Sequence, residues 1–167
     1  MTYLAGILAT LALLTSAIMA GFFFSYSVSV MWGFDAAAPG SAIDGMQKIN
    51  TVIQNAWFFP SFFGAPVFAV LAAIVFWAMG MRDVGVVFGL AGLCYLIGAF
   101  GITVAVNVPM NEALGRESIP LDAEAARALW MDYSTRWTWW NHIRTIASIA
   151  SALLCGLALF LAGRASA

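Results

Sequence analysis

The sequence contains very few charged residues for its length. Of its 167 residues, 7 are Lys or Arg and 8 are Asp or Glu, a charged fraction of 9%, whereas 63% are hydrophobic. A soluble domain carries about 25% charged residues, because it must cover its core with a hydrated surface. The composition therefore excludes an ordinary soluble domain. The net charge of −1 also excludes an electrostatic nucleic-acid binder, so no nucleic acid is expected as a partner.

Cysteine and histidine are also scarce. The two cysteines, Cys94 and Cys155, lie within apolar runs, where a thiol is usually a packing residue, and they form no CxxC pair. The single histidine, His142, excludes bis-His haem ligation within one protomer and zinc sites that need several imidazoles. We therefore expect no cofactor and assign no metal ligands, although the sequence leaves open a metal or haem held in another way.

Four long charge-free runs account for most of the chain, at 1–34, 49–81, 84–111 and 145–163. Each is long enough to cross a hydrocarbon layer, which needs about 20 apolar residues per helix. We predict an all-α, integral membrane four-helix bundle in a single domain, 1–167. Its predicted spans are about 4–31, 55–80, 84–108 and 143–163. The first run has no preceding Lys or Arg and exceeds the apolar region of a signal peptide, so we expect an integral helix there.

Four crossings place both termini at one end of the bundle and two longer segments, 35–54 and 112–144, at the other, which we call the loop-side end. In the second segment, Asp122 is placed to cap a helix that merges with the fourth span. Pro60 and Pro66 should interrupt the second span and leave room for a cavity. We expect a multi-pass protein of a bacterial inner membrane that contacts membrane lipid and a hydrophobic small-molecule ligand. A homo-oligomer is left open.

Polar residues recur at spacings of three and four near the loop-side end, which places each set on one helix face. The three sets are Gln47, Asn50 and Gln54; Thr103, Asn107 and Asn111; and Trp130, Tyr133, Trp137, Asn141 and Arg144, continued by Ser148. Such residues often hydrogen-bond neighbouring helices at about 1 kcal/mol per contact, and this is the alternative interpretation. We favour a functional site, because ionisable groups inside a membrane usually mark one.

Two ionisable residues stand out at this end. His142 is rotated by about 100° from Asn141 and aligns with Thr138 and Thr145. Histidine exchanges protons near neutral pH, so His142 is a candidate base, with a structural hydrogen bond as the alternative. Arg144 offers a permanent cation with a donor fork that suits a phenolate, a carboxylate or a lipid phosphate. Its alternative role is to reach toward lipid headgroups.

Tryptophan is concentrated in the same segment. Four of the seven tryptophans, Trp130, Trp137, Trp139 and Trp140, fall within eleven positions. Tryptophan is typical of the aromatic belt at a membrane interface, and a belt is our interpretation of Trp139. The other three are equally compatible with a belt and with the wall of a ligand site.

Four blocks of the sequence resemble the anthrone oxygenase-like family, whose bacterial members are mostly small membrane proteins. The blocks are Gly21-Phe22-Phe23-Phe24-Ser25 running to Val30-Met31, Met46-Gln47-Lys48-Ile49-Asn50, Asn107-Val108-Pro109-Met110-Asn111, and Trp137-Thr138-Trp139-Trp140-Asn141-His142-Ile143-Arg144-Thr145. The resemblance covers nearly the whole length, and the last two blocks are the most specific. Trp32 and Met110 depart from the family pattern, in which proline and leucine are usual, and neither departure touches a polar position.

The resemblance implies a four-helix membrane fold and, as in the fungal branch of the family, oxidation of an anthrone to an anthraquinone by molecular oxygen. Such a cofactor-independent monooxygenase needs a base, donors that stabilise an anion, and a slot for flat rings. We assign His142 as the base and Arg144, Asn107 and Asn111 as donors. The expected substrate contacts are Asn50, Gln47, Tyr133, Trp137, Trp140, Asn141 and Thr103.

The predicted substrate is a flat, hydrophobic phenolic or quinoid compound. The main alternative is a non-catalytic membrane protein or accessory subunit that binds a lipid, a quinone or a haem at the same place. A transporter ranks third, because the two halves show no inverted repeat and no span contains an ion-coupling carboxylate.

Overall fold

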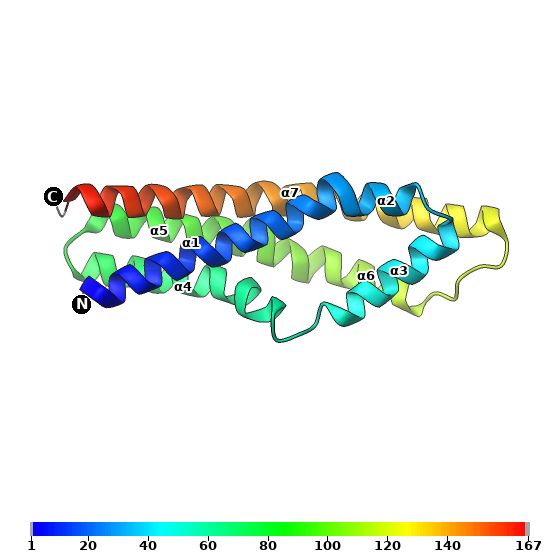
Figure 1. Ribbon diagram of the computed structural model, residues 1–167, viewed down its shortest axis with the longest axis horizontal. Coiled ribbons are helices and arrows are strands. Elements are labelled where there is room, and N and C mark those ends of the chain that lie inside the picture. Colours follow the sequence, from blue (N-terminus) through cyan, green and yellow to red (C-terminus); the bar gives the residue numbers. More distant parts are fainter. Residues whose placement is uncertain (1, 166–167) are drawn as a thin grey trace.

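The computed structural model describes residues 2–165, and most of them are helical. Four helical stretches are long and apolar enough to cross a membrane, namely Thr2–Asp35, Phe58–Ala78, Arg82–Arg116 and Ala123–Ala165. They run along the long axis of the molecule, and both chain ends lie at the same end of the bundle (Figure 1). The predicted all-α, four-helix membrane architecture is therefore confirmed.

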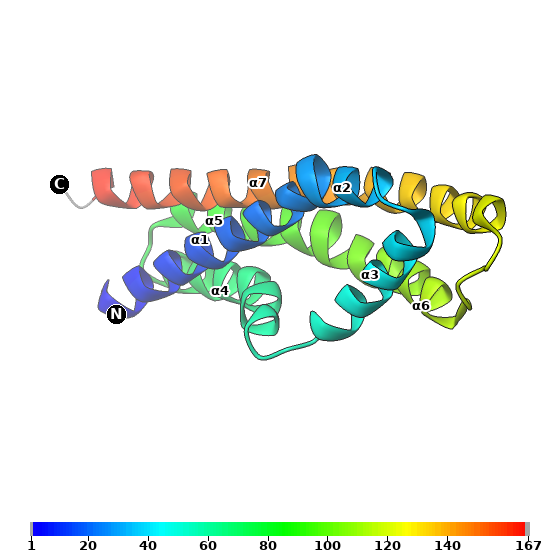
Figure 2. The same cartoon turned by 45° about the vertical axis from the view of Figure 1, so that its right-hand side comes forward.

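Two of the four stretches are divided by π-helical segments. The elements are α1 (Thr2–Ser25), η1 (Tyr26–Val30), α2 (Met31–Asp35), α3 (Pro39–Val52), α4 (Phe58–Ala78), α5 (Arg82–Tyr95), η2 (Leu96–Gly101), η3 (Thr103–Asn107), α6 (Val108–Arg116) and α7 (Ala123–Ala165). The short helix α3 crosses the loop-side end and packs against α6 and α7 (Figures 1 and 2).

Helix α7 is much longer than a membrane is thick. Asp122 caps it as predicted, because the Asp122 Oδ1 accepts a hydrogen bond of 2.8 Å from the Ala125 backbone N–H. Its 43 residues extend about 65 Å, roughly twice the 30 Å of a hydrocarbon layer. The charge-free part, 145–163, fits such a layer. Arg144 therefore lies at the edge of the layer, and the first half of α7 projects beyond it together with α2, α3 and α6.

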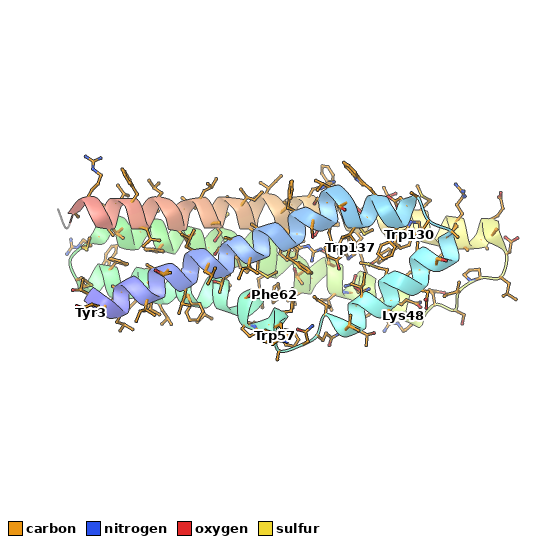
Figure 3. All side chains as sticks on the ribbon, in the orientation of Figure 1. Tyr3, Lys48, Trp57, Phe62, Trp130 and Trp137 are labelled. Atoms are coloured by element: carbon orange, nitrogen blue, oxygen red, sulfur yellow. The ribbon has the colours of Figure 1, made fainter. Side chains whose placement is uncertain are left out.

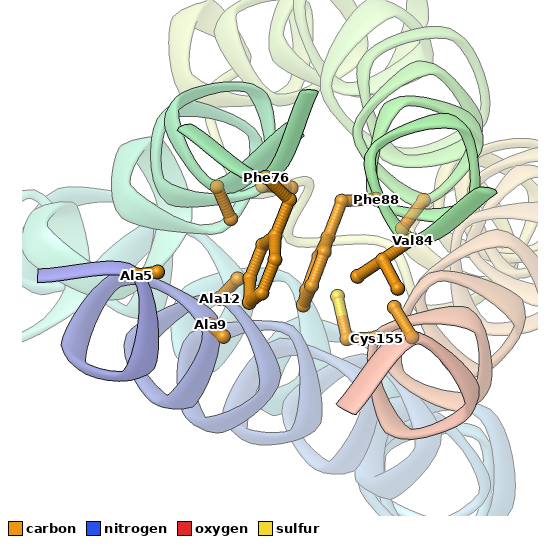
Figure 4. Packing of buried hydrophobic residues seen from close by; sticks show 11 residues of the cluster. Ala5, Ala9, Ala12, Phe76, Val84, Phe88 and Cys155 are labelled. Carbon is orange, nitrogen blue, oxygen red and sulfur yellow. The ribbon is translucent and has the colours of Figure 1, made fainter. Parts of the chain in front are cut away.

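The core at the termini-side end consists mainly of alanine and phenylalanine, and we call it the alanine–phenylalanine core. Phe76 of α4 and Phe88 of α5 stack with ring centroids 5.5 Å apart and planes 12° apart, beside alanines of α1 (Figure 4). Helices approach closely here, since a Cβ atom added to Gly85 would lie 2.9 Å from the Ala73 carbonyl oxygen. Cys155 packs into this core as a free thiol, as predicted.

The outer surface of the spans is apolar. Only 33–39% of each most apolar window is buried inside the protein. Large side chains such as Ile74, Leu153 and Phe160 are 60%, 69% and 61% exposed. Soluble proteins rarely expose apolar surface this extensively. The pattern is that of helices that face lipid on the outside and each other on the inside.

The two prolines of α4 have different effects. Pro60 is the third residue of the helix, where a backbone N–H would have no intrahelical partner, so the prediction that Pro60 interrupts the span is wrong. Pro66 lies inside the helix and removes the hydrogen bond that the Phe62 carbonyl would accept. Phe62 lines the cavity described next, so the freed carbonyl lies near it.

Candidate functional site

A cavity of about 500 Å³ lies at the loop-side end. Its walls come from α1, η1, α3, α4, η2, η3, α6 and α7. Six residues predicted for the site line it, namely Gln47, Asn50, Thr103, Asn111, Trp137 and Arg144. The other five, Asn107, Tyr133, Trp140, Asn141 and His142, do not line it. The structure therefore divides the predicted site into cavity residues and residues outside its lining.

Arg144 is the buried cation of the cavity, with only 4% of its surface exposed. Its guanidinium carbon lies 4.5 Å from the ring centroid of Phe23 and 4.8 Å from that of Trp137, which places a flat cation against two aromatic faces. One terminal nitrogen donates to the Asn141 Oδ1 at 2.8 Å and the other to the Thr103 Oγ1 at 3.2 Å. Neutral partners thus fix the orientation of the guanidinium.

No carboxylate pairs with Arg144. The ion pairs within residues 2–165 are Lys48 with Asp44 and Arg136 with Asp132, and both are exposed on the surface. The Arg144 Nε is buried and has no hydrogen-bond partner among the described residues. Burying an unpaired charge costs several kcal/mol. An anionic group bound in the cavity would offset that cost.

Asn111 presents its amide nitrogen to the cavity. Its Oδ1 accepts two hydrogen bonds, from the Tyr133 hydroxyl at 2.9 Å and from the Trp137 Nε1 at 2.8 Å. An indole N–H can only donate, so the accepting atom must be the oxygen. The amide NH₂ keeps both hydrogens for a ligand. Tyr133, predicted as a wall of the slot, instead holds Asn111 from behind.

Polar groups of α3 also line the cavity. Asn50 is one of them; its Nδ2 is buried without a hydrogen bond among the described residues, although its side chain lies near the Tyr133 hydroxyl. Gln47 uses its amide nitrogen on the backbone oxygens of Leu114 and Glu117, at 2.8 and 3.0 Å, and so ties α3 to α6. The carboxylate among the lining residues is Glu112. Within residues 2–165, His, Cys, Asp and Glu form no group of three or more that could hold a metal ion.

The residues outside the lining support those that form it. Asn107 donates to the Trp137 carbonyl at 3.4 Å. Asn141 donates to the Phe23 carbonyl and to the Ser27 Oγ, both at 2.8 Å, and the Ser27 Oγ lies 3.0 Å from the His142 Nδ1. His142 therefore contacts η1 and reaches the cavity only through other side chains.

The four tryptophans of the predicted cluster have different environments. Trp137 lines the cavity, whereas Trp130 is buried and donates to the Asp35 Oδ1 at 2.8 Å (Figure 3). Trp139 is 63% exposed, which fits the predicted aromatic belt. Trp140 is partly buried outside the lining.

Phenylalanines form much of the aromatic wall of the cavity, a role that the sequence predicted for Trp137, Trp140 and Tyr133. The Phe62 ring lies 5.3 Å from the ring of Phe58 at an interplanar angle of 18°, and 5.3 Å from the ring of Phe100 at 28°. Tyr26 also lines the cavity. The Phe-Phe-Pro-Ser-Phe-Phe run at 58–63 was the available signal, since it concentrates aromatic rings at the start of α4.

All three π-helical segments contribute to this region. Tyr26 and Ser27 belong to η1, Phe100 to η2, and Thr103 and Asn107 to η3. π-Helical turns are rare and occur frequently at functional sites. Each wider turn also rotates the residues that follow it, so a regular helical spacing does not predict which of them face the cavity.

The comparisons with known proteins bear on the same region. The family model described as anthrone oxygenase matches residues 55–154, which include Thr103, Asn111, Trp137 and Arg144. Comparison with curated proteins and with solved structures gives no match. The family match spans more than half of the 167 residues. The chain therefore belongs to the anthrone oxygenase family.

Proposed function

We propose that the protein is a membrane oxygenase that oxidises a flat, hydrophobic phenolic compound of the anthrone type in the loop-side cavity. The observation that carries this proposal is the buried Arg144, which has no carboxylate partner and lies among aromatic rings. An anion with delocalised charge on a flat ring system complements both features. Family membership supports the same reaction class.

The size and walls of the cavity suit such a ligand. Its volume of about 500 Å³ falls within the usual range for small-molecule sites. Flat rings can pack against Phe58, Phe62 and Phe100. Phe63 and Val104 line the cavity and are also 48% and 54% exposed on the apolar surface. A hydrophobic substrate can therefore enter between α4 and η3 directly from the membrane.

The reaction needs no external reductant. Loss of the benzylic proton of an anthrone gives an aromatic, phenolate-type anion. This anion passes one electron to dioxygen, and the resulting carbon radical and superoxide combine to form a C–O bond. The peroxide anion formed in this way takes up a proton to become a hydroperoxide, which loses water to give the second carbonyl, so anthrone and dioxygen become anthraquinone and water. Arg144 and the Asn111 amide would stabilise the negative oxygen that develops on the ring system.

The geometry favours Glu112 over His142 as the proton acceptor. His142, the base proposed from the sequence, does not line the cavity, whereas Glu112 lines it and is an exposed residue. A carboxylate in that position can take the benzylic proton and release it to water. Stabilisation of the anion by Arg144 makes this transfer easier.

Oxygen uptake and quinone formation by the purified protein, supplied with anthrone in lipid nanodiscs, test the proposal. Arg144→Met should lower kcat/KM at least about 100-fold, as loss of a charged donor to a developing anion does. Glu112→Gln should lower kcat and leave binding of the quinone product intact. Glu117→Gln, an exposed carboxylate outside the lining, is the matched control.

Two outcomes would contradict the proposal that the protein is an oxygenase with its site in this cavity. If the wild-type protein binds a phenolic anthraquinone but never turns over anthrone, the non-catalytic binding protein is the correct alternative. If Arg144→Met retains full turnover, the site lies elsewhere.

A further inference from the structure

A second polar cluster, centred on Ser27, lies between η1 and α7. The Ser27 Oγ contacts three side-chain atoms, the Asn141 Nδ2 at 2.8 Å, the His142 Nδ1 at 3.0 Å and the Thr145 Oγ1 at 3.0 Å. Ser27 is 4% exposed, so water does not compete freely for these contacts. Because a hydroxyl has one hydrogen and two lone pairs, three contacts saturate it.

Donor accounting gives a consistent direction for each contact. The Thr145 hydroxyl has one hydrogen and lies 2.9 Å from the Asn141 backbone oxygen; when it donates there, Ser27 is the donor toward Thr145. Ser27 then has no hydrogen left for His142. In this arrangement the His142 Nδ1 carries a hydrogen and donates it to Ser27, as the Asn141 amide does.

The same contacts set the orientation of Asn141. Its Nδ2 donates both to Ser27 and to the Phe23 carbonyl, which leaves its Oδ1 to accept from Arg144 at 2.8 Å. A chain of hydrogen bonds thus runs from His142 through Ser27 and Asn141 to the guanidinium. In this chain the His142 Nδ1 is a donor, so the ring nitrogen that could accept a proton is Nε2, and His142 does not line the cavity. The other ring nitrogen, Nε2, makes no hydrogen bond within residues 2–165.

We propose that His142 is a positioning residue for Arg144 and that it acts as an Nδ1–H donor to Ser27. It orients the guanidinium toward an anionic ligand and exchanges no proton with that ligand. The proposal rests on the proposed function only in the choice of ligand. The sequence predicted that this ring is the base. In the present proposal the ring instead supports the anion site, through Ser27 and Asn141.

Two conservative variants distinguish the roles. In His142→Asn the amide nitrogen occupies the place of Nδ1 and keeps the donor to Ser27, whereas in His142→Gln the amide nitrogen occupies the place of Nε2. Neither side chain can act as a base. The probe is 1,8-dihydroxyanthraquinone, a flat phenol whose absorption spectrum reports its ionisation, measured with protein in nanodiscs.

We expect His142→Asn to bind the probe within about twofold of wild type and His142→Gln to bind about fivefold more weakly, the effect of one lost hydrogen bond. Ser27→Ala should weaken binding as His142→Gln does, and the double variant should lose no more than either single variant. Anthrone turnover should follow the same order. If His142→Asn and His142→Gln both abolish turnover while probe binding stays at the wild-type level, His142 is the base and the proposal is wrong. Equal behaviour of all variants and wild type also overturns it.

If the proposed function is wrong, the same experiment gives a different result. If wild-type protein binds no probe, the ligand class is wrong. The unfolding midpoints of wild type and the four variants in detergent then test the Ser27 contact directly. Non-additive losses for Ser27→Ala and His142→Gln, with rescue by His142→Asn, support the positioning role, whereas additive losses overturn it.

Discussion

The two ends of the bundle bury their side chains in opposite ways. At the termini-side end, the alanine–phenylalanine core consists of apolar residues in close contact, including the stacked Phe76 and Phe88. At the loop-side end, Arg144, Asn107 and Asn141 are buried beside a cavity. The helices are continuous across both ends. One end of this fold is therefore closely packed, whereas the other keeps buried polar groups beside a cavity.

The distribution of unpaired polar atoms sharpens the contrast. None of the buried side-chain atoms without a partner within residues 2–165 belongs to the alanine–phenylalanine core; they are the Asn50 Nδ2, Tyr95 Oη, Asn107 Oδ1, Thr138 Oγ1, Arg144 Nε and Ser148 Oγ. Each such atom costs about 1–3 kcal/mol of stability. Departures from good packing of this kind are expected where a protein performs its function.

The largest expected effect is on stability, at the termini-side end. Phe88 is fully buried and stacked, so Phe88→Ala should lower the free energy of unfolding by about 3–5 kcal/mol. The loss of helical circular dichroism as SDS is added to detergent-solubilised protein measures it. Under native conditions the affinity for 1,8-dihydroxyanthraquinone should not change. A loss of affinity in this variant would show that the two ends are not separable.

A smaller effect is expected for Asn111→Asp at the loop-side end. The carboxylate keeps both accepted hydrogen bonds, from Tyr133 and Trp137, but adds a negative charge beside the cavity. Affinity for the anionic probe should fall about tenfold, because like charges repel in a partly buried site. Unsubstituted anthraquinone, which cannot ionise, is the control ligand; it loses the amide donor but meets no charge repulsion, so its affinity should fall less than that of the anionic probe. Equal losses of affinity for both ligands would indicate a packing defect and not charge repulsion.

The smallest effect is expected where the loop-side end meets the lipid. Trp139 is 63% exposed, so Trp139→Phe should change stability by less than about 0.5 kcal/mol. Its matched partner, Trp137→Phe, loses the hydrogen bond to Asn111 and should cost about 1 kcal/mol. Thermal unfolding of the two variants in nanodiscs compares them. If Trp139→Phe is the more damaging of the two, the assignment of Trp139 to the belt is wrong.

Much of the fold was predictable from the sequence. Charge-free runs longer than a membrane span dictate four helices, and Asp122 marks where the longest one begins. The spacing of Trp130, Tyr133, Trp137, Asn141 and Arg144 predicted a single buried face of α7, and all five are buried. A helix without interruption keeps its periodicity, so spacing is informative there.

The site was less predictable, because its other walls follow π-helical segments. Ser27 and Phe100 lie in such segments, where the regular angular step fails. For His142, in contrast, the helical spacing was informative. Its 100° offset from Asn141 already aligned it with Thr145, and the structure places both beside Ser27. That offset already separated His142 from the helix face of Asn141 and Arg144.

The most direct measurement is the pH at which 1,8-dihydroxyanthraquinone ionises when bound, followed by its visible spectrum in wild type, Arg144→Lys and Arg144→Met. An anion held by the buried guanidinium should ionise at least about one pH unit below the free dye. In Arg144→Met the bound dye should ionise above the free dye, because the cavity is then apolar without a cation. Arg144→Lys should fall between them, since an ammonium cannot reproduce the flat contact with Phe23 and Trp137. Ionisation at the same pH in all three proteins would contradict the role of Arg144 as the anion site.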